Sequence, residues 1–175
     1  RIVLTTLLML NLGALAPAEE TSPRSFYTVE DYDWRRDPLH DLAETLKLAR
    51  RDEKTVLVQV GGNWCGWCHI LERTFRQNER VANALGDEYL VMKINVSHEN
   101  PNEQFLSQLP PIQSYPHLFA FNADGALVGS QDASALESAR GYSERAILAL
   151  LKLWAPERDG SPQKTQSAQS TAIRP

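Results

Sequence analysis

The sequence predicts one α/β domain in which helices flank a central mixed β-sheet. Two apolar, β-branched stretches, 55–60 and 89–96, read as strands separated by helical patterns. A strand–helix–strand unit of this kind makes its two strands parallel, with a right-handed crossover. A third stretch, 117–122, reaches a Gly-containing turn and then a short run at 126–130, which is typical of an antiparallel hairpin. Parallel and antiparallel pairs together predict the mixed sheet.

Composition limits the classes of protein that this chain can belong to. Its 175 residues suit one domain with tails. The net charge of −4 gives no support for nucleic-acid binding, which requires a basic surface. Only two cysteines are present, so the chain is not a disulfide-stapled scaffold.

The first 36 residues divide into two predicted segments. Residues 1–18 resemble a signal peptide, with a positive Arg1, an apolar run and a small-x-small site at residues 16–18. The run is shorter than the roughly 20 residues that a membrane-spanning helix needs. We therefore expect a periplasmic or secreted protein, in a compartment that permits disulfides. Residues 19–36 read as a leader, whose aromatic-rich part at 26–34 is a candidate for a short first strand.

The folded domain is expected to span residues 37–155. Asp37 and Pro38 form a helix start, with the aspartate as N-cap and the proline in the first turn. The helix that follows has an apolar face at Leu39, Leu42, Ala43, Leu46 and Ala49. After the strand at 55–60, Gly61-Gly62-Asn63 breaks the pattern.

Further helical patterns complete the domain. Two follow the cysteines, with apolar positions at Ile70, Leu71 and Phe75 and then at Val81, Ala82 and Leu85. A short helix is expected within 102–109, a loop or short helix within 131–140, and a last helix over 143–154. Pro156 stops that helix, and residues 156–175 are polar enough to be disordered.

The chemistry lies in the stretch from Trp64 to His69, which contains both cysteines in a C-x-x-C arrangement. A bridge across two residues closes a short ring and adds little stability, which favours chemistry over stapling. Cys65 should lie at a helix N-terminus, where free N–H groups and the helix dipole lower a thiol pKa. Cys65 is therefore the predicted nucleophile, and Cys68 the resolving thiol.

This C-x-x-C after a buried strand, the order of elements and Tyr115-Pro116 before the hairpin resemble the thioredoxin superfamily. More narrowly, the Cys-Gly-Trp-Cys site resembles exported bacterial thioredoxin-like proteins. The resemblance covers about residues 37–155. It implies disulfide exchange with protein substrates and a membrane redox partner that resets the cysteines. It implies no metal or organic cofactor.

The resemblance also assigns positions around the cysteines. Pro116 would be a cis-proline against the C-x-x-C, and Tyr115 would flank the substrate groove. From its position beside the cysteines, Trp64 is expected either to form part of the site wall or to belong to the core. Between the cysteines, Gly66 and Trp67 would tune the reduction potential or offer a platform for partner proteins. Thioredoxins typically have Gly-Pro there, so Trp67 leaves the direction of exchange open.

One substitution separates this chain from typical thioredoxins. Gln59 stands where they have a buried aspartate that helps to move the proton of the resolving cysteine. An amide cannot titrate. A water molecule, Glu72 or His69 are the candidate substitutes, and the sequence does not choose among them.

Two histidines have several interpretations. His69 either stabilises the Cys65 thiolate when protonated, acts as the axial ligand of a haem, or is a solvated residue. His117 is either a second titratable group near the thiols or only the first residue of a strand.

Three other functions remain open. The chain is either a non-catalytic thioredoxin-fold binding module, a c-type haem electron carrier that uses C-x-x-C-H, or half of a zinc site. In a haem protein the distal ligand would be Met92, His98 or His117. Several strands argue against a small c-type cytochrome. A zinc site needs four ligands, and no second cysteine pair exists.

Overall fold

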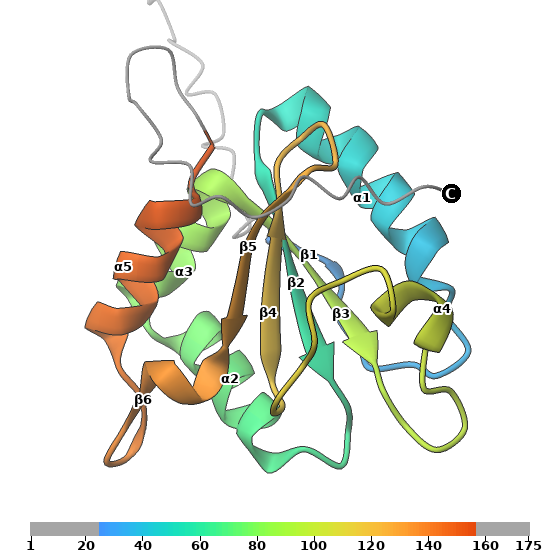
Figure 1. Ribbon diagram of the computed structural model, residues 1–175. Helices are drawn as coiled ribbons and strands as arrows, with labels where there is room; N and C mark the ends of the chain where they lie inside the picture. Colours follow the sequence, from blue (N-terminus) through green and yellow to red (C-terminus); the bar gives the residue numbers. More distant parts are fainter. Residues whose placement is uncertain (1–24, 157–175) are drawn as a thin grey trace, which may run out of the picture.

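The computed structural model describes residues 25–156, in which helices cover both faces of a five-stranded sheet (Figure 1). The strand order is β1-β3-β2-β4-β5. Strands β1 and β2 pair in parallel with β3, whereas β4 pairs antiparallel with both β2 and β5. The predicted mixed α/β sheet is therefore confirmed. The strands are β1 (Tyr27–Val29), β2 (Thr55–Gly61), β3 (Tyr89–Asn95), β4 (His117–Phe121) and β5 (Leu127–Asp132).

The helices form two layers. On one face lie α1 (Pro38–Asp52) and α4 (Glu103–Leu106); on the other lie α2 (Gly66–Gln77), α3 (Glu79–Glu88) and α5 (Glu144–Trp154) (Figure 1). Capping side chains explain where three of them begin. The carboxylate of Asp37 accepts from the N–H groups of residues 39 and 40, while Asn78 and Ser143 cap α3 and α5 in the same way.

Alternate residues of the central strands feed two separate hydrophobic cores. In β2, Leu57 points toward α2, α3 and α5, whereas Val56, Val58 and Val60 point toward α1 and α4. All residues of β2 and β3 are buried, as expected for strands covered on both faces. Because of this alternation, only every second side chain of a central strand points toward the helix that holds the cysteines.

Some boundaries differ from the sequence expectations. Strand β1 confirms the short first strand suggested by the aromatic-rich part of the segment 19–36, and it brings that part of the predicted leader into the sheet. The short helix α4 is four residues long, because it ends in a turn at Ser107. Residues 131–140 contain a 3₁₀ helix, η1 (Ala133–Leu136), and one strand of a small hairpin, β6 (Glu137–Ser138) with β7 (Gly141–Tyr142).

Two predicted segments fall outside the described residues. The signal peptide expected at 1–18 and nearly all of the tail expected at 156–175 are not among them. Between residues 25 and 156, no helix has the length and apolar character needed to cross a membrane.

Candidate active site

The two cysteines lie at the start of α2, just after the carboxyl end of β2. Cys65 is the N-cap residue, and its Sγ accepts a hydrogen bond from the N–H of Cys68 at 3.1 Å. The two residues form a disulfide with their Cα atoms 5.3 Å apart. Cys65 retains 5% exposure, whereas Cys68 is fully buried. Free N–H groups at a helix start favour negative charge, so the geometry suits a Cys65 thiolate.

Two exposed indoles flank the disulfide. Trp64 is 59% exposed, and its Nε1 donates to the carbonyl of Val96 at 2.7 Å, which fixes the ring orientation. Its ring meets Tyr115 edge-on at 5.5 Å. Trp67 is 39% exposed and packs edge-on against Tyr142 at 5.6 Å. The disulfide therefore lies between two supported, outward-facing aromatic side chains.

The Tyr115–Pro116 peptide bond is cis, as the resemblance implied. Pro116 is buried directly before β4, and its carbonyl accepts from the N–H of Ala133 at 3.2 Å. Tyr115 packs against the buried cluster formed by Tyr32, Cys65 and Cys68. This cis bond therefore lies beside the cysteines, although residues 115 and 116 are far from the cysteines in the sequence.

Gln59 is fully buried on β2, on the α2 side of the sheet. Its Nε2 donates to the carbonyl of Cys68 at 3.3 Å. Its Oε1 finds no partner among residues 25–156. The amide therefore orients the backbone of Cys68 and supplies no titratable group.

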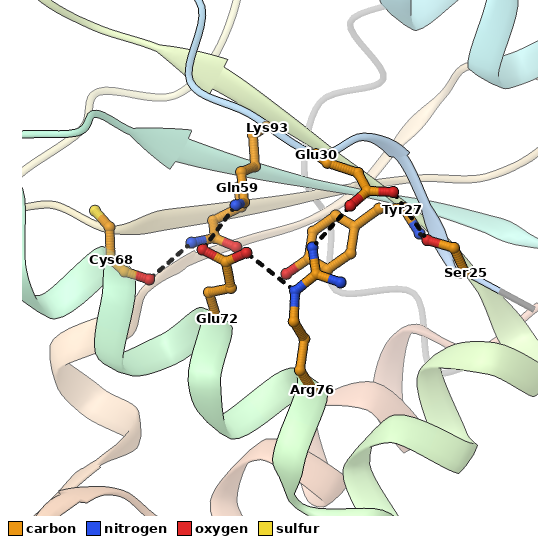
Figure 2. A network of polar contacts seen from close by, with 8 residues as sticks. All are labelled: Ser25, Tyr27, Glu30, Gln59, Cys68, Glu72, Arg76 and Lys93. Atoms are coloured by element: carbon orange, nitrogen blue, oxygen red, sulfur yellow. Dashed lines mark hydrogen bonds and ion pairs between the residues drawn. The ribbon is translucent and has the colours of Figure 1, made fainter. Parts of the chain in front are cut away.

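A chain of ion pairs runs from the strand below Cys68 to the protein surface (Figure 2). Lys93 lies opposite Gln59 in the sheet, and its Nζ lies 2.8 Å from Oε2 of Glu72 on α2. Arg76 donates to Glu72 at 3.0 Å and to Glu30 at 3.1 Å. Burial raises the pKa of Glu72, but hydrogen bonds from Lys93 and Arg76 outweigh it, so the net pKa lies below its ordinary value. Glu72 is therefore held as a carboxylate.

The two histidines do not meet at the disulfide. His69 is exposed, and its Nε2 lies 3.0 Å from the carbonyl of Asn63. His117 is buried and lies opposite Val60 in the sheet, on the face that points away from α2. The imidazole ring of His117 packs on the ring of Phe119. Its Nε2 lies 2.9 Å from the Ser130 hydroxyl. Burial lowers the pKa of His117, against the opposing effect of Asp132.

The haem and zinc interpretations gain little from this arrangement. Met92 belongs to the core under α1 and α4, as does the strand face that carries His117. Both residues therefore lie across the sheet from the helix that holds the cysteines. Across residues 25–156, no group of three or more histidine, cysteine, aspartate or glutamate side chains is placed to hold a metal ion.

Sequence reasoning missed two residues of this site. Tyr32, from the segment before α1, packs against both cysteines. Lys93 lies 5% exposed within the apolar run of β3. A lone lysine inside a buried strand pattern was a usable signal, because such a charge requires a partner. For Tyr32 no local signal existed.

Gly61 permits the close approach of these groups. A Cβ added there would overlap Cys68 Sγ and lie 3.1 Å from Tyr32 Oη. We expect Gly61→Ala to lower the free energy of unfolding of the oxidised protein by about 2 kcal/mol, as overpacking does. Urea denaturation checks this. Gly66→Ala is the matched control, because a Cβ there meets no atom within 4 Å. An equal loss in both variants would contradict the steric explanation.

Comparison with known proteins adds three findings. A family model described as thioredoxin-like matches residues 34–123. The crystal structure of a disulphide isomerase from Xylella fastidiosa Temecula1 is 27% identical, with a TM-score of 0.59 over 69% of this chain and 93% of that chain. Human spermatogenesis-associated protein 20 and an uncharacterized Caenorhabditis elegans protein are each 31% identical over 52 residues. That match spans 30% of this chain but only 7% of either relative.

Proposed function

The chain belongs to the thioredoxin-like family, and from that premise we propose that it is a thiol–disulfide oxidoreductase acting on protein substrates outside the cytoplasm. One observation carries the proposal. Cys65, which keeps 5% exposure, caps α2 and is bridged to Cys68, which has none. This asymmetry suits an attacking thiol and a resolving thiol.

The proposed exchange moves two electrons. In the reductive direction, the Cys65 thiolate attacks a substrate disulfide, forms a mixed disulfide and releases one substrate thiolate. The Cys68 thiolate then attacks Cys65 Sγ, which closes the Cys65–Cys68 bond and releases the second substrate thiolate. The oxidative direction runs through the same steps in reverse. Protons leave or reach the thiolates through solvent.

The substrate-binding surface that we propose surrounds the more exposed sulfur. Trp64 and Trp67 offer apolar area, and both rings are held by neighbouring groups. Gly66 leaves space open at the start of α2, since a Cβ added there would meet no atom within 4 Å beyond its chain neighbours and its own helix backbone. Tyr115 packs against the cysteine cluster with its ring against Trp64, and the cis bond joins it to Pro116. These features suit an extended, partly apolar segment of a protein substrate.

The proposed location and partners rest on the chemistry of the pair. A disulfide persists in an oxidising compartment such as the periplasm or the extracellular space. The similar structure from Xylella fastidiosa is that of a disulphide isomerase, which supports protein thiols or disulfides as substrates. An enzyme of this kind needs a second protein to restore its cysteines after each cycle, and we propose a membrane redox partner for that step.

A glutathione redox titration of the whole chain, read by intact mass, tests the proposal. We expect a reversible change of two hydrogen atoms. A potential near roughly −270 mV would assign a reductant, and one between −120 and about −180 mV an oxidase or isomerase. The absence of any reversible two-electron change would contradict the proposal. Partners retained by a Cys65→Ala, Cys68→Ala double variant would then identify a binding module.

A further inference from the structure

Tyr32 places a buried hydroxyl without a partner beside the resolving cysteine. Its side chain packs against Cys65 and Cys68, and it is 4% exposed. Its Oη makes no hydrogen bond of normal geometry with residues 25–156, and the polar side chain nearest to it in effect is that of Gln59, which lowers the pKa of Tyr32 against the larger effect of burial. Both Oη and Cys68 Sγ border the space next to Gly61, where a Cβ would meet both atoms. An unsatisfied buried hydroxyl is costly, so its position beside a redox-active sulfur requires a reason.

The segment that carries Tyr32 is anchored at this site. The side-chain amide of Asn63 donates to the carbonyl of Tyr32 at 3.1 Å, just before the cysteine motif. Lys93 Nζ lies 5.2 Å from the centre of the Tyr32 ring, within the range of a cation–π contact. The backbone of Tyr32 is therefore held by Asn63, and its ring is held by Lys93 of the sheet.

The other polar groups near Cys68 are already engaged. Glu72 is paired with Lys93 and Arg76, which makes its carboxylate a poor proton carrier. His69 is turned toward the carbonyl of Asn63 at the surface. Gln59 donates one of its two amide hydrogens to the carbonyl of Cys68. The Tyr32 hydroxyl makes no hydrogen bond within residues 25–156 and is therefore available as a donor to Cys68 Sγ.

We propose that Tyr32 Oη donates a hydrogen bond to Cys68 Sγ when the disulfide is reduced, and so stabilises the dithiol form. This inference rests on the proposed disulfide exchange. In the oxidised protein Cys68 Sγ is bonded to Cys65 and is a weak acceptor, so the hydroxyl lacks a partner. Reduction provides a thiolate or thiol as the acceptor.

The step balances without a further reactant. A glutathione thiolate attacks Cys65 Sγ, the Cys65–Cys68 bond breaks, and Cys68 leaves as a thiolate that accepts the Tyr32 hydrogen bond. A second glutathione thiolate then attacks the sulfur of glutathione in the mixed disulfide, which frees Cys65 and forms oxidised glutathione. Both protein thiolates take protons from solvent. Tyr32 keeps its own proton, because burial raises its pKa well above the ordinary value.

Tyr32→Phe, which removes one oxygen atom, tests the proposal in the full chain. We expect the equilibrium with glutathione to shift about tenfold toward the Cys65–Cys68 disulfide. For a two-electron couple, this shift makes the reduction potential about 30 mV more negative. Tyr27→Phe is the matched control. Its hydroxyl is also buried without a partner, and its ring also lies 5.2 Å from Lys93, but it lies outside the cysteine cluster. The control should leave the equilibrium unchanged.

The outcomes separate this inference from the proposed function. If wild type shows no two-electron change, the proposed function fails. If wild type titrates but Tyr32→Phe equals Tyr27→Phe, or shifts toward the dithiol, the inference fails while the function stands. Should Tyr32→Phe not fold, carbon-13 labelling of the tyrosine Cζ atoms gives a second measurement on wild type. The Tyr32 signal, assigned by replacing each of the other four tyrosines, should move on reduction. An unmoved signal would overturn the proposal.

Discussion

Replacing Cys65 with serine is expected to abolish disulfide exchange, whereas replacing Cys68 with serine should leave a variant that traps its substrates. Cys65 is the more accessible of the two cysteines, because it keeps 5% exposure whereas Cys68 is fully buried. Cys65 also caps α2, where the N–H of Cys68 donates to its sulfur. A hydroxyl at this position is not ionised near neutral pH and attacks a disulfide very poorly.

The Cys68→Ser variant keeps the attacking thiol but lacks the group that resolves the mixed disulfide. Incubation with an oxidised protein substrate, followed by a non-reducing gel and intact mass measurement, should show stable adducts for this variant alone. Residual exchange by the Cys65→Ser variant should stay at the background level. Adducts that accumulate with Cys65→Ser instead would reverse the assignment of the two roles.

Glu72→Gln is expected to destabilise the folded protein by about 2 kcal/mol. The change leaves the ammonium of Lys93, whose side chain is only 3% exposed, without its carboxylate. Loss of one partner from a fully buried pair typically costs about 3–5 kcal/mol. We expect less here, because the Glu72 side chain is 23% exposed and solvent screens the pair. Chemical denaturation at neutral pH measures the effect.

Glu30→Gln is the matched control for this variant. It removes a carboxylate from the same chain of ion pairs, but at the exposed end. Arg76 loses Glu30 in this variant and keeps its ion pair with Glu72. A surface pair of this kind contributes at most about 1 kcal/mol, so the control should be nearly neutral. If both variants lost the same stability, the buried Lys93 would not be the cause.

The pH dependence of the Glu72 contribution has a defined sign. The folded-state pKa of Glu72 lies below the unfolded value, because the two cations outweigh its burial. Its contribution is therefore complete above the unfolded pKa, about 4.3 for glutamate, and is lost as the pH falls through the lower folded value. The stability difference between wild type and Glu72→Gln should accordingly shrink only below about pH 4.5. A difference that shrank between pH 6 and 8 would point to another group.

The local patterns of the sequence were sufficient for the main helices and strands and for the position of the cysteine pair. Asp37 with Pro38 marked the start of α1, and alternating apolar residues marked β2 and β3, because capping and periodicity depend on neighbours in the chain. The spacing of Cys65 and Cys68 after a strand placed both at the start of a helix. The mixed sheet followed from the order of these elements.

Only the tertiary structure decided which distant side chains surround the sulfurs. Tyr32 precedes α1 in the chain yet packs on Cys65 and Cys68, and Lys93 reaches Glu72 from a strand two elements later. The register of β4 turned His117 to the face away from α2, which no pattern near residue 117 revealed. Such placements depend on strand pairing and on which face of the sheet each helix covers. They are consequences of long-range packing, so the local sequence around each residue does not contain them.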